Sequence, residues 1–372
     1  IELRSTLPTI TSPLLIDGYS QPGSQANSSL VGSNAKLMIE LGVAGRFDIL
    51  KLWASDSTIR GLAFEPAFVS LAGEEPVTWR ESSIRMGNLP FNRITGNFFG
   101  TNAKGECVGK RRQGGSVFLQ GKGTIMGGAL PEERNIVGCG ASVVAGSETG
   151  VFGNLIGVGI DGVTSIEGSE GDGVELVNTS KYGISASGPG TEIGRVEPGW
   201  GNVIAFHARS GVQVTRTGAP GDVSIRGNTI YSNTRLDDVF FYGRESEGGI
   251  NTPNIPRRVY DVTESDDAQN APILNSAINS AAGTTVKGVL YSTPDSTFIL
   301  DFYLNTDAHA SGHGEGKKYL GSTSVESDAD GLVDFSFLVP NGIPQGKLVV
   351  AAANYAGRGP STFSARIAVG DV

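Results

Sequence analysis

A short phrase that recurs through the first two thirds of the chain constrains the fold most strongly. It is an asparagine followed by two residues that are mostly apolar, usually next to glycine. Its asparagines are Asn97, Asn135, Asn154, Asn202 and Asn228. The gaps between them are 38, 19, 48 and 26 residues. Counted as two, one, two and one units, these gaps predict a repeat of 19 to 26 residues.

Each repeat predicts short strands. The phrases alternate with a period of two and are bounded by Gly, Asn or Asp. Glycine supplies 54 of 372 residues, roughly twice its usual share, and glycine disfavours helix interiors. We therefore predict a parallel β-helix over 1–252, with about three short strands per coil and an asparagine ladder at one turn, and with residues 65–92 as an outward insertion. The residues expected to point inward are Ile59, Ile94, Phe98, Ile136, Leu155, Val203, Val212 and Ile230.

The pattern changes after residue 252. Residues 253–270 are rich in Pro, Asn and Asp, which predicts a linker. Longer alternating strands follow, near 271–279, 284–292, 296–306, 317–327, 332–339, 347–356 and 361–369. Seven strands in about 100 residues favour a small immunoglobulin-like β-sandwich over 271–372. The predicted fold class is therefore all-β, a pectin-lyase-like parallel solenoid followed by a sandwich.

Several segments resemble bacterial right-handed parallel β-helix surface proteins. IDGYSQPG at 16–23 is similar to the opening of these proteins, and GNFFGTNAKG at 96–105 is similar to one of their coils. GWGNVI at 199–204 resembles their turn, and SGHGEGKKYLGS at 311–322 resembles a hairpin of the sandwich that often follows. The resemblance implies a right-handed solenoid in a secreted or cell-surface protein. It also implies an upstream secretion signal and an N-terminal capping segment.

The resemblance and the missing catalytic set predict an extracellular structural or adhesive module of a bacterial envelope, with a glycan or another protein as partner. The first residues already show the apolar pattern of a coil, with Leu3, Leu7 and Ile10. We therefore expect an upstream segment or another subunit to cover the first coil, since solenoid ends need caps. At the other end the segment 235–244 and the sandwich are the expected cover.

Charge and composition exclude several other classes. The formal net charge is −9, of which −7 falls after residue 259. Neither part has the positive excess that nucleic-acid binding requires, and no apolar run is long enough for a transmembrane helix. Three histidines and two cysteines leave little scope for metal chemistry, and His309 and His313 lack an evident third ligand. Cys107 and Cys139 could pair or stay free, and no cofactor is predicted.

The alternative function is a polysaccharide lyase or glycoside hydrolase acting along a groove of the β-helix. The densest mixture of acids, arginines and aromatics is 235–244, so Arg235, Asp237, Asp238 and Arg244 are the candidate catalytic residues. A glycosidase needs a second carboxylate at a set separation, and no motif identifies one. Lys181, Arg195 and Arg209 are available as charge neutralisers for a lyase, but their spacing singles none out.

Exposed aromatics supply the candidate ligand-binding residues. Trp53, Trp200 and Tyr242 could present flat surfaces to sugars, although packing beneath a loop is the commoner role of such side chains. Asp161 and Asp172 lie in an acidic stretch with the residue types that calcium prefers. The stretch matches no calcium-binding signature, which favours a solvated turn and no metal.

Overall fold

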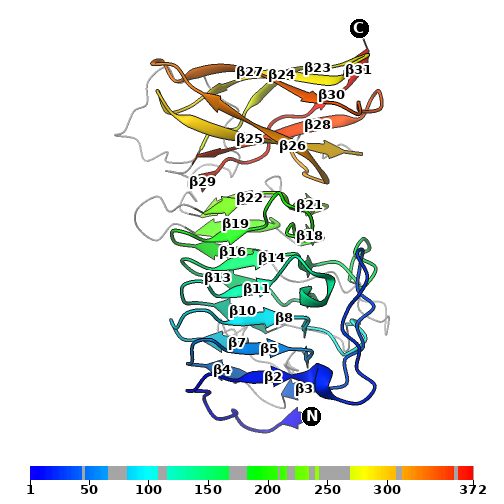
Figure 1. The fold of residues 1–372 in the computed structure, drawn as a ribbon, viewed down its shortest axis with the longest axis vertical. Coiled ribbons are helices and arrows are strands. Elements are labelled where there is room, and N and C mark those ends of the chain that lie inside the picture. The colour runs from blue at the N-terminus through cyan, green and yellow to red at the C-terminus, as the bar shows by residue number, and fades with distance from the viewer. Residues whose placement is uncertain are drawn as a thin grey trace, which may run out of the picture.

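The computed structural model describes residues 1–43, 47–65, 82–107, 115–166, 182–207, 210–215, 223–233, 239–242, 269–306, 312–355 and 359–371. The chain builds an elongated molecule with the first residues at one end and the last at the other (Figure 1). A stack of short parallel strands occupies the N-terminal part, and an antiparallel sandwich lies on its far end. The described helices are two single 3-10 turns, Gly18–Ser20 and Pro131–Glu133.

Three parallel sheets form the solenoid. Sheet 1 contains β1 (Glu2–Leu3), β3 (Glu40–Val43), β6 (Ala63–Phe64), β9 (Phe98–Phe99), β12 (Ile136–Val137), β15 (Leu155–Ile156), β18 (Val203–Ala205) and β21 (Thr229–Tyr231). Sheet 2 contains β4 (Leu50–Leu52), β7 (Ser82–Met86), β10 (Ser116–Leu119), β13 (Val143–Ala145), β16 (Ile184–Ser187), β19 (Val212–Thr215) and β22 (Val239–Tyr242). Sheet 3 contains β2 (Leu15–Asp17), β5 (Thr58–Arg60), β8 (Arg93–Thr95), β11 (Ile125–Gly127), β14 (Gly150–Phe152), β17 (Glu192–Ile193) and β20 (Ser224–Ile225). The chain visits the three sheets in turn, so the predicted parallel β-helix is confirmed.

The predicted repeat length is wrong. Ile136 pairs directly with Phe98 on one side and with Leu155 on the other, and Leu155 pairs with Val203. Each gap between the repeated asparagines is therefore one coil, including the gaps of 38 and 48 residues that were counted as two. The extra residues of the long coils lie between strands and leave the register intact. The insertion predicted over 65–92 is also too long, because Ser82–Met86 forms β7, with Ile84 and Met86 buried.

The asparagine ladder is confirmed. The backbone N–H of Asn154 and its side-chain Nδ2 both donate to Oδ1 of Asn202, each at 3.0 Å. Nδ2 of Asn154 also donates to the carbonyl of Met126 at 3.1 Å. Asn97, Asn135 and Asn202 make the same contacts to the next asparagine of the ladder. All five asparagines are buried, and the ladder satisfies polar groups at this corner that have no access to water.

Left-handed residues turn the chain at the corners, which accounts for much of the glycine. Two residues before the sheet 3 strands, φ lies between 52° and 70° in five successive coils. The residues at this position are Asp56, Phe91, Gly123, Glu148 and Gly190. Glycine adopts this conformation freely, whereas a bulky side chain is strained there. Phe91 is therefore the unusual member of the series.

Sheet 1 is apolar on both faces, and this corrects the inward assignment of four residues. Phe99, Val137 and their equivalents line the solenoid interior together with Ile59, Ile94, Val212 and Ile230, so these last four predictions are confirmed. On the middle strands, the preceding residues Phe98, Ile136 and Leu155 belong to a separate cluster, and Val203 packs against it. Because neighbouring strand residues point to opposite faces, Phe98, Ile136, Leu155 and Val203 point outward. Loops that carry Leu37, Val158 and Ile166 cover them.

A disulfide lies in this covering layer. Cys107 and Cys139 are bonded, with a Cα–Cα distance of 5.6 Å, and each is only 5% exposed. Arg134 adds polar contacts to the same layer, because its guanidinium donates to the carbonyls of Gly32 and Leu30 at 2.6 and 3.1 Å. Burial lowers the pKa of Arg134. The layer thus joins loops that lie about 100 residues apart in the sequence.

Removing the disulfide should weaken the protein. The bond closes a loop with a sequence separation of 32 residues, for which chain entropy predicts a contribution of roughly 3–4 kcal/mol. The double variant Cys107→Ser, Cys139→Ser should show this loss in chemical denaturation, and dithiothreitol should produce it in the wild type but not in the variant. A loss below about 1 kcal/mol would show that the covering layer is held by its other contacts alone.

The second part of the chain is an antiparallel sandwich. One sheet has the order β27 (Leu332–Val339), β24 (Gly283–Tyr291), β23 (Ile273–Ser280) and β31 (Gly370–Asp371). The other has the order β26 (Lys318–Glu326), β25 (Thr297–Asn305), β28 (Leu348–Tyr355) and β29 (Gly359–Pro360), with β30 (Ile367–Ala368) also paired to β28. With β23 as the first strand, this is the immunoglobulin-like order, so the predicted sandwich is confirmed.

The strand predicted over 361–369 is interrupted. The hydroxyls of Ser361 and Ser364 take the place of backbone carbonyls beside β28. They accept hydrogen bonds from the backbone N–H groups of Ala353 and Ala351, respectively, at 2.9 Å each. Phe363 lies between them and packs into the solenoid core instead of the sandwich core. The regular ladder is therefore broken where the segment turns one side chain toward the other part of the molecule.

Candidate functional site

The described structure joins its two parts through one hydrophobic core. Tyr303, Val350, Ala352 and Phe363 of the sandwich belong to the same buried cluster as the last coils of the solenoid, which contribute Val223, Ile225 and Ile230. The alternate residues of β25 and β28, such as Phe302 and Ala351, fill the sandwich's own core. Strands β25 and β28 therefore bury both faces, one within the sandwich and one on the solenoid end.

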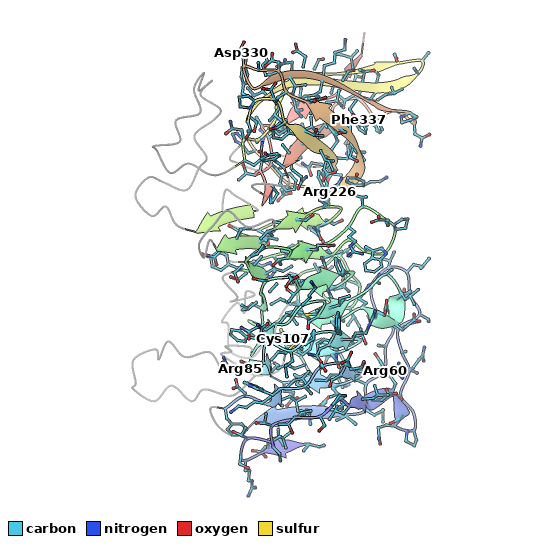
Figure 2. The ribbon with its side chains drawn as sticks, turned by 60° about the vertical axis from the view of Figure 1, so that its left-hand side comes forward. Arg60, Arg85, Cys107, Arg226, Asp330 and Phe337 are labelled. Atoms are coloured by element: carbon cyan, nitrogen blue, oxygen red, sulfur yellow. A yellow bond between two sulfur atoms is a disulfide. The ribbon has the colours of Figure 1, made fainter. Side chains whose placement is uncertain are left out.

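An ion pair with a buried carboxylate joins the two parts at this junction. Arg226, which follows β20, donates to both carboxylate oxygens of Asp301 on β25, at 2.8 and 2.6 Å. Asn354 and Tyr319 also donate to this carboxylate, at 2.9 and 3.4 Å. Burial raises the pKa of the Asp301 carboxyl, against the opposing hydrogen bond and charge of Arg226. The Asp301 side chain is 1% exposed, and Figure 2 shows Arg226 at the boundary between the two parts.

Backbone contacts extend the junction beyond side chains. Ile230 and Gly316 exchange both N–H to carbonyl hydrogen bonds, at 2.9 and 2.8 Å. The hydroxyl of the fully buried Tyr303 accepts from the N–H of Gly227 at 3.2 Å, one residue before the last asparagine of the ladder. The sandwich thus covers the last coil. The sequence predicted two covers for this end of the solenoid, and the sandwich is one of them. The other, segment 235–244, lies largely outside the described residues.

The predicted ligand-binding tryptophans differ in accessibility. Trp53 is 40% exposed and directly follows β4, where it lies against Gly87 of the next coil. Trp200 is half-buried and packs edge-to-face on Phe152, with ring centroids 5.1 Å apart. The Arg195 guanidinium covers both rings of this pair, at 4.6 and 4.9 Å. Trp200 is therefore committed to a structural cluster, whereas Trp53 is accessible.

Arg195, a candidate charge neutraliser for a lyase, also makes an ion pair with Glu192 at 2.7 Å. Similar pairs lie on the outer face of sheet 3 nearer the N-terminus, namely Arg60 with Asp17 and Arg93 with Glu133. These arginines are balanced by carboxylates, so the described part of this face does not present an unpaired basic row to a uronate substrate.

Asp161 is exposed and satisfied within its own turn. Its carboxylate accepts from the N–H groups of Val163 and Thr164, at 3.0 Å each, and from the Thr164 hydroxyl at 2.6 Å. Burial acts to raise its pKa, but these hydrogen bonds outweigh that effect and lower it. The described residues contain no group of three or more His, Cys, Asp or Glu side chains arranged for a metal ion.

The remaining candidates fall on parts that the structure does not describe. Arg235, Asp237, Asp238 and Arg244 lie outside the described residues, as do Asp172, Lys181, Arg209 and His309. Tyr242 ends β22, where its backbone pairs with Thr215. The structure therefore does not test the catalytic candidates, which stay predictions.

One buried titratable group escaped the sequence reasoning. His207 is 1% exposed, and its Nδ1 lies 3.0 Å from Oδ1 of Asn233, which also accepts its backbone N–H at 3.1 Å. Its Nε2 has no hydrogen-bond partner among the described residues. Burial lowers the pKa of His207 to about 4. Gly157 and Gly183 provide the space for the ring, since a Cβ on either would lie within 2.8 Å of it.

His207 should make the protein sensitive to mild acid. Its unfolded pKa is near 6.5, so the neutral folded form contributes full stability above pH 6.5 and loses it as the pH falls toward 4. The linked loss is about 3 kcal/mol. Denaturation at pH 7.5 and pH 4.5 should show a steeper loss for the wild type than for His207→Asn, which does not titrate. Equal losses in both proteins would contradict the assignment.

No helix among the described residues is long and apolar enough to cross a membrane. No protein-family model matches the sequence, and a search of curated proteins gives no match. The architecture, a parallel β-helix joined to an antiparallel sandwich through a shared core, is therefore the firmest basis for a functional conclusion.

Proposed function

We propose that this protein is an extracellular structural or adhesive module, a rigid rod that holds or spaces a partner at a bacterial cell surface. The shared core carries this proposal. Phe363, Tyr303 and the Arg226–Asp301 pair bury the sandwich on the last coil, so the two parts cannot turn independently without exposing apolar surface and a buried charge. A long solenoid with a fixed end domain transmits position and force along its axis.

The disulfide supports the extracellular location. Cys107 and Cys139 are paired and buried, and such bonds persist in oxidising compartments but are rare in the cytosol. The ladder of buried asparagines and the covering layer further favour a durable scaffold. These features require no substrate turnover, which distinguishes the proposal from the lyase or hydrolase alternative.

Small-angle X-ray scattering tests the rigidity of the rod. The wild type should fit a single elongated shape, whereas Phe363→Asp, which places a carboxylate in the shared core, should increase the maximum dimension and the flexibility. Leu338→Asp is the matched control, because Leu338 is 44% exposed on the sandwich and its variant should scatter like the wild type. A flexible wild type would contradict the proposed rod.

Labelling of intact cells tests the location. An antibody against the sandwich should bind unbroken cells, and a thiol reagent should label the protein only after reduction and unfolding. Deleting the gene should reduce surface attachment or envelope integrity. Recovery of the protein inside the cell with free thiols would overturn the extracellular assignment.

A further inference from the structure

One corner of the solenoid exposes three large apolar side chains on two successive coils. Trp53 is 40% exposed, Leu89 38% and Phe91 56%. Trp53 follows β4, and Leu89 and Phe91 lie between β7 and β8, so all three occupy the turn from sheet 2 to sheet 3. The turns touch, because the N–H of Asp56 donates to the carbonyl of Pro90 at 3.1 Å. We call Trp53, Leu89 and Phe91 the aromatic corner.

Phe91 has a left-handed backbone conformation, which glycine adopts more easily at the equivalent turn of other coils. Its φ is 61°, and the equivalent residues of two later coils are Gly123 and Gly190. A bulky residue with this φ costs free energy. Its ring lies over Gly123, but more than half of the residue is exposed. Packing therefore offsets little of the free-energy cost of this backbone conformation. We infer that the Phe91 ring serves to contact another molecule.

Polar groups suited to sugar hydroxyls surround the corner. Asp56 and Asn88 are exposed, and their side chains have no hydrogen-bond partner in the part of the chain that the structure describes. Lys122, whose carbonyl accepts from the N–H of Phe91 at 3.0 Å, is balanced by Glu148 at 3.1 Å. Lys51, two residues before Trp53, has no ion-pair partner among the described residues, and its charge is offset by that of Asp56. The corner therefore combines accessible rings with free hydrogen-bonding groups and balanced charge.

We propose that the aromatic corner binds a neutral polysaccharide of β-linked pyranose sugars. The C–H groups on the faces of such sugars are attracted to the electron-rich face of an aromatic ring, and their hydroxyls can pair with Asp56 and Asn88. The balanced charge disfavours an acidic polymer. The inference rests on the proposed adhesive function and gives it a ligand class.

Calorimetric titration of the whole chain with a hexasaccharide of β-1,4-linked glucose or N-acetylglucosamine tests the proposal. At least one should bind, and a galacturonic acid hexasaccharide should not. Trp53→Ala should weaken binding at least about tenfold, as expected when a central aromatic contact is removed. Phe91→Gly should weaken binding about tenfold while its melting temperature stays equal or rises, because glycine relieves the strained φ.

Asp295→Gly is the matched control. Asp295 is exposed in a turn of the sandwich, with φ of 47°, so this variant makes the same kind of backbone change away from the corner and without removing a ring. It should bind the sugar like the wild type. Absence of binding by either neutral hexasaccharide at millimolar concentration, or equal binding by the Trp53 and Phe91 variants, would overturn the glycan site. Docking of a protein at the corner with no sugar binding would do the same. The scattering test of the rod is independent of these outcomes.

Discussion

Asn154→Ala should be among the most damaging single substitutions in the solenoid, with a loss of about 4–6 kcal/mol in the free energy of unfolding. Asn154 accepts two hydrogen bonds from Asn135, at 3.2 and 2.8 Å, and donates to Asn202 and Met126. Alanine would leave donors and acceptors on both neighbouring coils buried and unpaired, in addition to a cavity. Chemical denaturation followed by circular dichroism measures the loss.

Two further variants define what the ladder contributes. Asn154→Asp keeps the shape and the acceptor oxygens but loses the Nδ2 donor and buries a charge, so it should be about as damaging as alanine. Asn88→Ala, on the exposed turn, should change stability by less than about 0.5 kcal/mol. If Asn154→Ala lost less than about 1 kcal/mol, the ladder would be a consequence of the stacked coils and not a cause of their stability.

Asp301→Ala should cost about 3–5 kcal/mol, because it leaves Arg226 in the junction without its carboxylate. Tyr319 and Asn354 would lose the same acceptor. Since this group lies between the solenoid and the sandwich, which share one core, we expect a single thermal transition for the wild type in calorimetry and a broadened or split transition for the variant. The double variant Arg226→Met, Asp301→Leu should recover much of the stability, because it removes both charges together.

The exposed pair of Arg60 and Asp17 is the natural comparison for this ion pair. Its N–O distance is also 2.6 Å, but the side chains are 45% and 20% exposed. Asp17 also accepts the N–H of Tyr19 at 3.0 Å, so Arg60→Ala is the variant that removes the ion pair alone. It should cost no more than about 1 kcal/mol. Equal effects of Arg60→Ala and Asp301→Ala would show that burial of the junction pair has no energetic consequence.

The sequence alone predicted the architecture because its signals are local. The phrase at Asn97, Asn135, Asn154, Asn202 and Asn228 carries both the strand and the turn of a coil, and the ladder follows from stacking equal positions. The longer alternating strands after residue 270 likewise predicted a sandwich. Trp53 was predicted as an exposed aromatic, and it is 40% exposed. Each of these inferences needs only period-two geometry and residues suited to turns.

The sequence missed the coil length and the direction of four sheet 1 side chains for a common reason. Phe98 and Phe99, like Ile136 and Val137, are adjacent apolar residues, so alternation shows that one faces inward without showing which one. Loops of different length separate equivalent positions, so spacing does not count coils. Phe91 was not predicted as a binding residue, because the sequence does not show that a phenylalanine in a turn has a positive φ.

The sequence by itself determined that this chain folds into stacked short strands followed by a sandwich, because repeated turns and alternation are properties of neighbouring residues. Only the tertiary structure decided that Arg226 meets Asp301, that Cys107 meets Cys139, and that Phe363 leaves its own sandwich for the solenoid core. These contacts join residues 32 or more positions apart, through loops whose paths depend on which apolar faces remain to be covered. The physical reason is that burial is a property of the assembled surfaces, and no local pattern specifies which surface will cover another.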